Sequence, residues 1–200
     1  VTVLTVIGVF LGGVGLPALG VGYVVNTLND NATAGDSLCT LREAIASANN
    51  AGNGDCGANS SGDDTITFSI SGTITLSSQL PTIVSGQGAL TINGGGNITV
   101  SGNNSVRVLQ VASGAQLTLQ NIKIIQGNAT FGGGIRNFGT LTVTNSTLSG
   151  NSAGAGGGIR NDGTLHVTHS TISGNSASQG GGIMNVGTLT ITNSTISGNS

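Results

Sequence analysis

The sequence predicts a parallel β-helix, and a 24-residue repeat is the main observation behind that prediction. Three copies occupy the end of the chain and begin at Gly132, Gly156 and Gly180. A fixed period of this length is typical of solenoids, in which each repeat buries its apolar face only by stacking on a neighbour. Within a copy such as GTLTVTNSTLSGNS, apolar residues alternate with small polar ones, which is the period of a strand. Short strands joined by Gly and Asn corners along one axis form such a β-helix.

Alignment of the copies predicts what each position does. Four apolar columns should form the interior: Ile135, Ile159 and Ile183; Leu141, Leu165 and Leu189; Val143, Val167 and Ile191; and Leu148, Ile172 and Ile196. Two polar columns should form asparagine ladders: Asn137, Asn161 and Asn185, and Asn151, Asn175 and Asn199. Asparagine at a corner tolerates left-handed φ, and its amide can bond the equivalent amide one coil away. The threonines of the TLTVT strands should point outward.

Composition narrows the class of protein. The chain has 36 glycines, two prolines and no collagen-like triplet period, which fits tight backbone corners. Five Lys and Arg residues against seven Asp and Glu residues give a formal net charge of −2. Such a surface argues against nucleic acid as a partner, because binding it needs a basic face.

Residues 1–22 form an uncharged, largely apolar segment. Its apolar part, from Val1 to Leu19, suits the hydrophobic region of a signal peptide with small residues near Ala18. A membrane anchor is the second interpretation, since about twenty apolar residues can span a bilayer. Packing as a first strand of the solenoid is the third. Pro17 and the glycines favour the signal peptide.

Residues 23–64 are predicted to form an N-terminal cap with one short helix. Thr40 is a natural helix N-cap, and Glu43 three residues later completes a capping box. Leu41 and Ile45 lie on one apolar face with Ala44 and Ala48, so the helix should cover the open end of the stack. The two cysteines, Cys39 and Cys56, are 17 positions apart, and in a secreted context we expect them to form one disulfide.

The β-helix itself is predicted for residues 65–200. Strand-like segments such as TITFSI, TITLSS and QLTLQNIKII precede the regular copies and look like irregular versions of them. Leu117 already lies 24 residues before Leu141, so the register holds there. We expect the coils to continue beyond residue 200.

One motif resembles a known family. The string Cys39-TLREAIASAN, preceded by VVNTLND and followed by a second cysteine and DDTITF, closely resembles the CSLREA domain of secreted bacterial β-helix proteins, with Thr40 in place of Ser. The GGGI and SGNSA repeats are similar to those of chlamydial polymorphic outer membrane proteins, although Leu148, Ile172 and Ile196 stand where those repeats carry Phe. Together the resemblances cover residues 23–200. They imply a right-handed parallel β-helix, exported, often within a larger surface or outer-membrane protein, and they transfer no catalytic motif.

Many parallel β-helices act on polysaccharides, and such activity needs clustered carboxylates. From residue 65 onward the only carboxylate is Asp162. Neither a two-carboxylate glycosidase site nor a calcium site can be assembled from one such group. Asp63 and Asp64 are adjacent, and adjacent residues on a strand face opposite ways. We therefore expect no enzymatic activity, no cofactor and no metal site in this segment.

Outward positions that differ between copies are the remaining candidates. Arg136 and Arg160 should stack, while Asp162, His166 and His169 all lie in the middle copy. They form a candidate surface patch for an anion or a metal. The favoured interpretation is a surface pair of Arg160 with Asp162, with the histidines as tolerated substitutions.

These observations predict a secreted or cell-surface bacterial stalk with a structural or adhesive role, an adhesin that contacts carbohydrate or other surface proteins. Membrane contact is expected only through residues 1–22 if they are not cleaved. The alternative is the N-terminal part of a polysaccharide lyase or hydrolase whose active site lies beyond residue 200. An ice-binding surface is a weaker third possibility, because the Thr-x-Thr strands resemble one but His166 interrupts them. The oligomeric state is left open.

Overall fold

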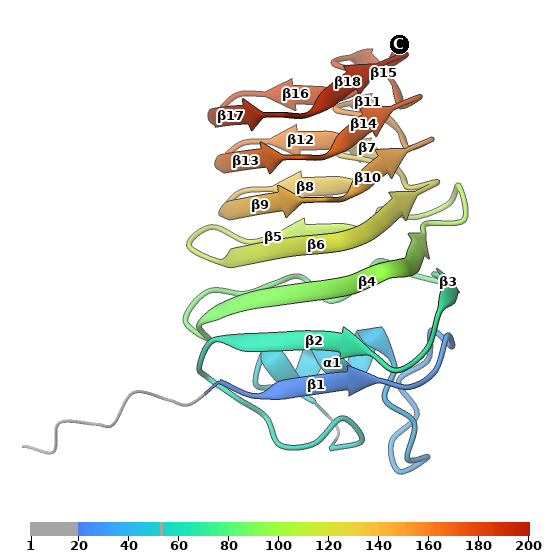
Figure 1. The fold of residues 1–200 in the computed structure, drawn as a ribbon, viewed down its shortest axis with the longest axis vertical. Helices are drawn as coiled ribbons and strands as arrows, with labels where there is room; N and C mark the ends of the chain where they lie inside the picture. Colours follow the sequence, from blue (N-terminus) through green and yellow to red (C-terminus); the bar gives the residue numbers. More distant parts are fainter. Residues whose placement is uncertain (1–19, 53) are drawn as a thin grey trace, which may run out of the picture.

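A computed structural model describes residues 20–52 and 54–200. Residues 1–19, which hold nearly all of the signal-like segment, lie outside the described residues. The described chain is a parallel β-solenoid of about six turns with about 24 residues in each coil. Figure 1 shows its right-handed course, with the strands of successive coils stacked along the long axis. The fold class predicted from the repeat is therefore confirmed.

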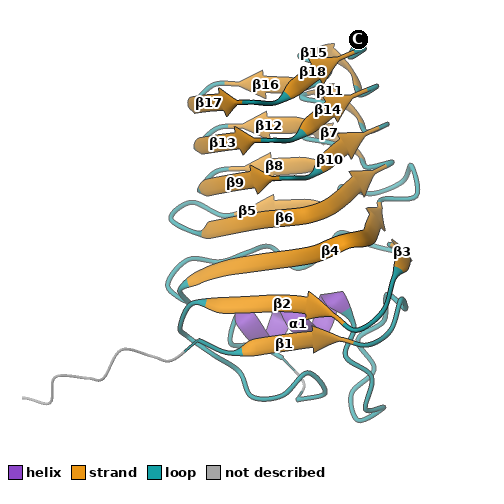
Figure 2. Cartoon of the chain, in the orientation of Figure 1, coloured by secondary structure: helices purple, strands orange, loops and turns teal. Residues whose placement is uncertain are grey.

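Three parallel sheets form the walls of the solenoid, as Figure 2 shows. The largest contains β1 (Gly22–Val25), β2 (Asp64–Phe68), β3 (Gly72–Thr75), β4 (Ala89–Ser101), β6 (Gln116–Ile125), β9 (Thr140–Thr144), β10 (Thr147–Ser149), β13 (Thr164–Thr168), β14 (Thr171–Ser173), β17 (Thr188–Thr192) and β18 (Thr195–Ser197). The second contains β7 (Asn128–Phe131), β11 (Ser152–Ala155) and β15 (Ser176–Gln179). The third contains β5 (Leu109–Val111), β8 (Ile135–Asn137), β12 (Ile159–Asn161) and β16 (Ile183–Asn185).

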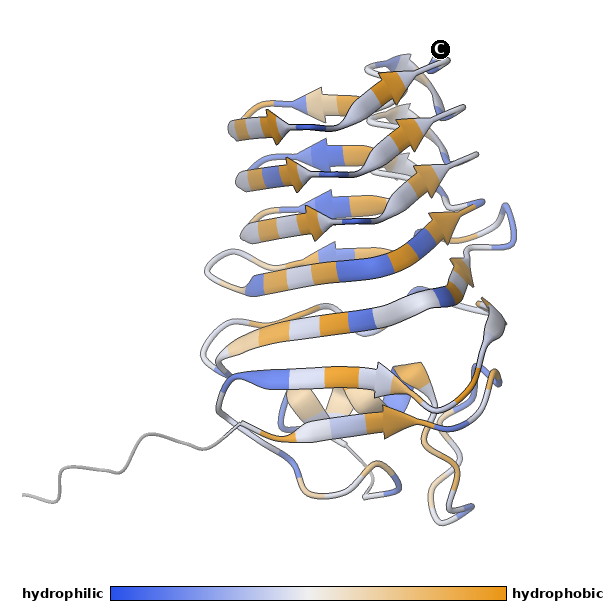
Figure 3. Cartoon of the chain, in the orientation of Figure 1, coloured by the Kyte–Doolittle hydropathy of each residue, from blue (hydrophilic) through white to orange (hydrophobic). Residues whose placement is uncertain are grey.

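The late coils stack in the predicted register. Ile159 of β12 pairs with Ile135 on one side and Ile183 on the other, and the Leu column of β9, β13 and β17 pairs in the same way. Ile135 and Ile159 are completely buried, and Ile183 packs against the same core. Figure 3 shows the result as apolar bands that recur at the same place in successive strands. Alternation therefore sends one set of side chains inward in every coil.

The ends of the stack differ. At the N-terminal end, α1 (Leu41–Ala48) lies behind β1 and β2 and contacts both, and Leu41 and Ile45 belong to the main hydrophobic core (Figure 1). That the helix closes the open end of the stack stays a prediction. In the last described coil, Ile191 and Ile196 are each 42% exposed.

The solenoid begins earlier than residue 65. β1 pairs with β2 along its whole length, Tyr23 opposite Ile66, so the first strand of the sheet precedes the cap. The cap is thus an insertion between two neighbouring strands. Tyr23 is fully buried, and its hydroxyl donates to the carbonyl oxygen of Ala58 at 3.0 Å.

Both asparagine ladders are present inside the coil. The Asn137 amide donates to Asn161 Oδ1 at 2.7 Å, and the Asn161 amide donates to Asn185 Oδ1 at 2.6 Å. In the second ladder the corresponding distances are 2.9 Å from Asn151 to Asn175 and 3.0 Å from Asn175 to Asn199. The amides of the first ladder also donate to backbone carbonyls of the next coil, such as Asn137 to Thr164, and those of the second ladder donate to carbonyls of the preceding coil, such as Asn175 to Leu148. The ladders therefore satisfy buried polar groups, which would otherwise be costly.

The expectation of left-handed φ at the ladder residues is wrong. The left-handed column is instead Asn145, His169 and Asn193, with φ of 48°, 49° and 49°. These residues turn the chain between consecutive strands such as β9 and β10, where a short polar side chain tolerates that conformation. None of the six ladder asparagines has a positive φ, and those of the first ladder are the last residues of β8, β12 and β16.

Candidate functional site

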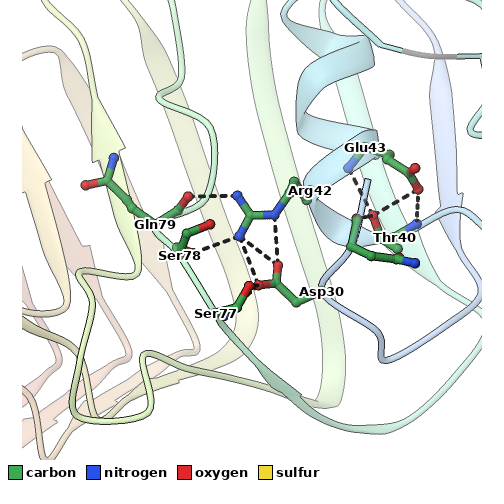
Figure 4. Close-up of polar contacts among 8 residues, drawn as sticks. Asp30, Thr40, Arg42, Glu43, Ser77, Ser78 and Gln79 are labelled. Atoms are coloured by element: carbon green, nitrogen blue, oxygen red, sulfur yellow. Dashed lines mark hydrogen bonds and ion pairs between the residues drawn. The ribbon is translucent and has the colours of Figure 1, made fainter. Parts of the chain in front are cut away.

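Polar contacts of the cap involve the charged residues of the CTLREA motif. The Arg42 guanidinium bonds both carboxylate oxygens of Asp30, at 2.8 and 3.0 Å, and donates to the carbonyl oxygens of Ser78 at 2.7 Å and Gln79 at 2.8 Å (Figure 4). Asp30 Oδ2 accepts from the backbone N–H of Ser77 at 2.7 Å and from its hydroxyl at 2.9 Å. Arg42 therefore joins three segments: the loop before the helix, the helix and the loop after β3.

The capping box is confirmed. The Thr40 side chain accepts from the Glu43 N–H at 3.2 Å, and the Glu43 carboxylate accepts from the Thr40 N–H at 3.0 Å. Glu43 is only 2% exposed. Its carboxylate accepts the N–H of the helix N-cap and is buried, so it is poorly placed to act on a substrate.

The disulfide between Cys39 and Cys56 is also confirmed, with Cα atoms 4.7 Å apart. Next to it, Asn26 accepts the N–H of Cys39 with its side chain, and its own N–H donates to the Cys39 carbonyl. The end of β1 is thereby tied to the start of α1. Structural disulfides form in oxidising compartments.

A cavity of about 260 Å³ lies beside the helix and is lined by Ala32, Arg42, Glu43, Ala46, Ala51 and Pro81. Its charged residues, Arg42 and Glu43, are engaged in the bonds described above. What remains is an apolar lining, which offers no reactive group.

A second cluster, here called the arginine ridge, consists of Arg107, Arg136 and Arg160 with Phe131 and Phe138. Arg136 of β8 and Arg160 of β12 are register partners, as predicted. The Arg136 guanidinium lies 4.4 Å from the centre of the Phe138 ring and 5.1 Å from that of Phe131, and Arg160 lies 5.3 Å from the Phe131 ring. Cation–π contacts of this kind hold a guanidinium in a defined orientation.

Arg107 is the member of the ridge that lies in the coil before Arg136. It donates to the carbonyl oxygens of Phe131 and Gly132 and to the side chains of Gln79 and Gln110, at 2.8 to 3.2 Å. Burial, and secondarily the charge of Arg136, lower the pKa of Arg107 below its ordinary value. Arg107 is therefore a partly buried cation with a structural role.

Asp162 lies beside the arginine ridge and pairs with two of its arginines. Both Nε and Nη2 of Arg160 donate to its Oδ1, at 3.0 and 2.9 Å, which confirms the predicted pair. Its Oδ2 lies 3.8 Å from Arg136 Nε. One carboxylate thus serves two guanidinium groups.

His166 and His169 do not join the ridge. His166 lies in β13, in the large sheet, paired with Thr142 and Thr190, whereas Arg160 lies in the third sheet on the opposite side of the coil (Figure 1). His169 occupies the left-handed turn after β13 and does not belong to that strand. Within residues 20–52 and 54–200 there is no group of three or more His, Cys, Asp and Glu residues suited to a metal.

The outward threonines form a regular surface on the large sheet. Thr140, Thr164 and Thr188 pair in register, as do Thr144, Thr168 and Thr192. His166 interrupts the column between them.

In the described part of the chain, no helix is long and apolar enough to cross a membrane.

A further ladder was not predicted. Ser170 Oγ accepts the Ser146 N–H, and Ser194 Oγ accepts the Ser170 N–H, each at 3.1 Å. The recurrent Ser of the NST and HST triplets was the available signal.

Comparison of the chain with protein-family models, with curated proteins and with solved structures finds no match.

Proposed function

We propose that this chain is an exported β-solenoid stalk with a structural or adhesive role, which contacts carbohydrate or protein at a cell surface. The disulfide and the resemblance of the CTLREA segment to CSLREA domains support export into an oxidising compartment.

The observation that best supports this proposal is that the ionisable groups are engaged in structural contacts. The charged residues of the motif hold the cap together, and the carboxylate of the coils pairs with arginine. General acid–base chemistry on sugars normally needs two carboxyl groups at a defined separation. What the coils present outward is mainly Thr, Ser and Asn, which suits hydrogen bonding to hydroxyl-rich or peptide surfaces.

Adhesion can be measured with beads that carry the purified 200-residue chain. We expect retention on at least one surface coated with neutral polysaccharide, acidic polysaccharide or protein, above that of beads carrying an unrelated protein. The same protein should release no reducing ends from a polysaccharide panel. Turnover that disappears in Asp162→Ala would contradict the proposal and place an active site on the arginine ridge, and an absence of adhesion to every surface would contradict the adhesive role.

A further inference from the structure

Charge is divided unevenly along the chain. Residues 1–64 hold one Arg and six Asp or Glu residues, whereas residues 65–200 hold four Lys or Arg residues and Asp162 alone. Three of those four cations belong to the arginine ridge, and the fourth, Lys123, is exposed on β6 in the large sheet. The coils therefore carry a local excess of positive charge on one side.

Arg136 differs from its two neighbours in how its nitrogens are used. Arg107 is bonded to four different residues, and Arg160 is bonded to Asp162. Among the described residues, the Arg136 guanidinium makes no hydrogen bond, and its ion pair with Asp162 Oδ2 is long, at 3.8 Å. Its Nε is buried without a hydrogen-bond partner, while its side chain as a whole remains 26% exposed.

Arg136 is also held in position. Its guanidinium contacts the rings of Phe131 and Phe138 at 5.1 and 4.4 Å. A planar, ring-supported guanidinium with open Nη–H groups matches the two oxygens of a carboxylate or a sulfate, and little side-chain entropy is lost on binding. Phe131, 38% exposed, adds an apolar face beside it.

We propose that Arg136, with Arg160 beside it, binds the carboxylate or sulfate groups of an acidic polysaccharide, with Phe131 against a face of the sugar ring. Asp162 orients Arg160 and leaves the ridge with a formal excess of two positive charges. The proposal rests on the adhesive function proposed above and specifies its ligand.

A polysaccharide fits the surroundings better than an acidic protein does. Ser152 of β11 and Ser176 of β15 are exposed in the second sheet, to which Phe131 of β7 also belongs, and their hydroxyl groups suit those of a sugar. The coils also repeat at the strand spacing of about 4.8 Å. A regular polymer can meet such a surface with repeated groups.

The test measures binding of the 200-residue chain to polygalacturonate, dextran sulfate, neutral dextran and polyglutamate by biolayer interferometry. We expect binding to one or both acidic polysaccharides, and the two arms separate carboxylate from sulfate recognition. Arg136→Gln should weaken that binding about tenfold, the equivalent of one well-made charged contact. Arg136→Lys should weaken it several-fold, because the charge remains and the fork is lost.

Lys123→Gln is the matched control, since it removes the same charge from a different sheet. It should change the affinity less than twofold, and thermal melting should show that each variant is folded. Equal weakening by Arg136→Gln and Lys123→Gln, or equal binding of neutral dextran, would overturn the inference while adhesion itself still stands. Tighter binding to polyglutamate than to either polysaccharide would overturn the choice of ligand class. If the wild-type chain adhered to none of the surfaces in the bead assay, that result would instead contradict the proposed function.

Discussion

Asn161 is the central rung of its ladder, and its removal tests whether the ladder stabilises the coils. The side chain is fully buried. Its Oδ1 accepts from Asn137 at 2.7 Å, and its amide nitrogen lies within bonding distance of Asn185 Oδ1 at 2.6 Å, the Thr188 carbonyl at 2.9 Å and the Gly163 carbonyl at 3.2 Å. Two amide hydrogens shared among three acceptors, plus one accepted bond, amount to three full hydrogen bonds.

Asn161→Ala should lower the free energy of unfolding by about 3 kcal/mol. A buried hydrogen bond contributes about 1 kcal/mol net, and acceptors left unpaired in the interior add to the loss. Asn161→Asp should cost more, because a carboxylate would face the carbonyl oxygen of Thr188 and the amide oxygen of Asn185. Urea unfolding followed by far-UV circular dichroism gives these differences, provided that the free energy of unfolding depends on urea concentration with the same slope in the wild type and the variants.

Asn185→Ala provides the control at the exposed end of the same ladder. Asn185 donates to the Gly187 carbonyl at 2.8 Å in solvent-exposed surroundings, where water can replace a lost partner. It also accepts from the Asn161 amide at 2.6 Å, but that amide keeps the carbonyls of Thr188 and Gly163 as acceptors. Its removal should cost under about 1 kcal/mol. If Asn161→Ala and Asn185→Ala destabilise the 200-residue chain equally, burial of the ladder is not what makes it stabilising, and the reasoning fails.

Three further predictions concern the N-terminal end. Ile45→Asp should destabilise the protein by several kcal/mol, because it places an unpaired charge in the core, and an unchanged melting temperature would show that α1 is not a cap. Thiol titration of unreduced, denatured protein should find no free thiol, and loss of the Cys39–Cys56 bond should cost about 3 kcal/mol. Burial, with a smaller effect of Asp64, raises the pKa of Tyr23 to about 12, so stability should be complete below pH ~10 and fall as the pH rises towards 12. The absorbance of this single tyrosine reports its ionisation, and Tyr23→Phe should remove that alkaline step from the stability curve.

The late coils were predictable because their sequence repeats their structure. Each interior position faces the same position one coil away, so alignment of the copies already identifies neighbours such as Leu141 and Leu165. The capping box and the disulfide were predictable for a different reason. Thr40 and Glu43 are close in sequence, and the cysteines had no other partner.

Contacts between unlike segments could not be found in this way. Arg42 meets Asp30 and the loop after β3 only because β1 pairs with β2 across the cap, and no sequence period connects those segments. The left-handed turn was assigned to the wrong asparagines for a related reason. Asn145 and Asn151 are both conspicuous corner residues, and only the backbone shows which of them turns the chain and which points inward.

The ridge is where the coils depart from their own repeat, and that makes its extension a direct test. The column that holds Arg136 and Arg160 continues as Met184, and the column that holds Phe131 continues as Ala155 and Gln179. Interior positions must repeat because each packs on its equivalent, whereas outward positions can vary at little cost to stability.

Met184→Arg should therefore lengthen the cationic column by one coil without disturbing the core. An added surface charge that meets the ligand contributes about 0.5 to 1 kcal/mol, or roughly two- to fivefold in affinity for an acidic polysaccharide. Thr190→Arg adds the same charge to the large sheet and should change the affinity little. If both variants gain equally, attraction depends on the net charge of the chain. If only Met184→Arg gains, the polymer lies along the arginine column, because only there does a new cation fall in line with the two that are already present.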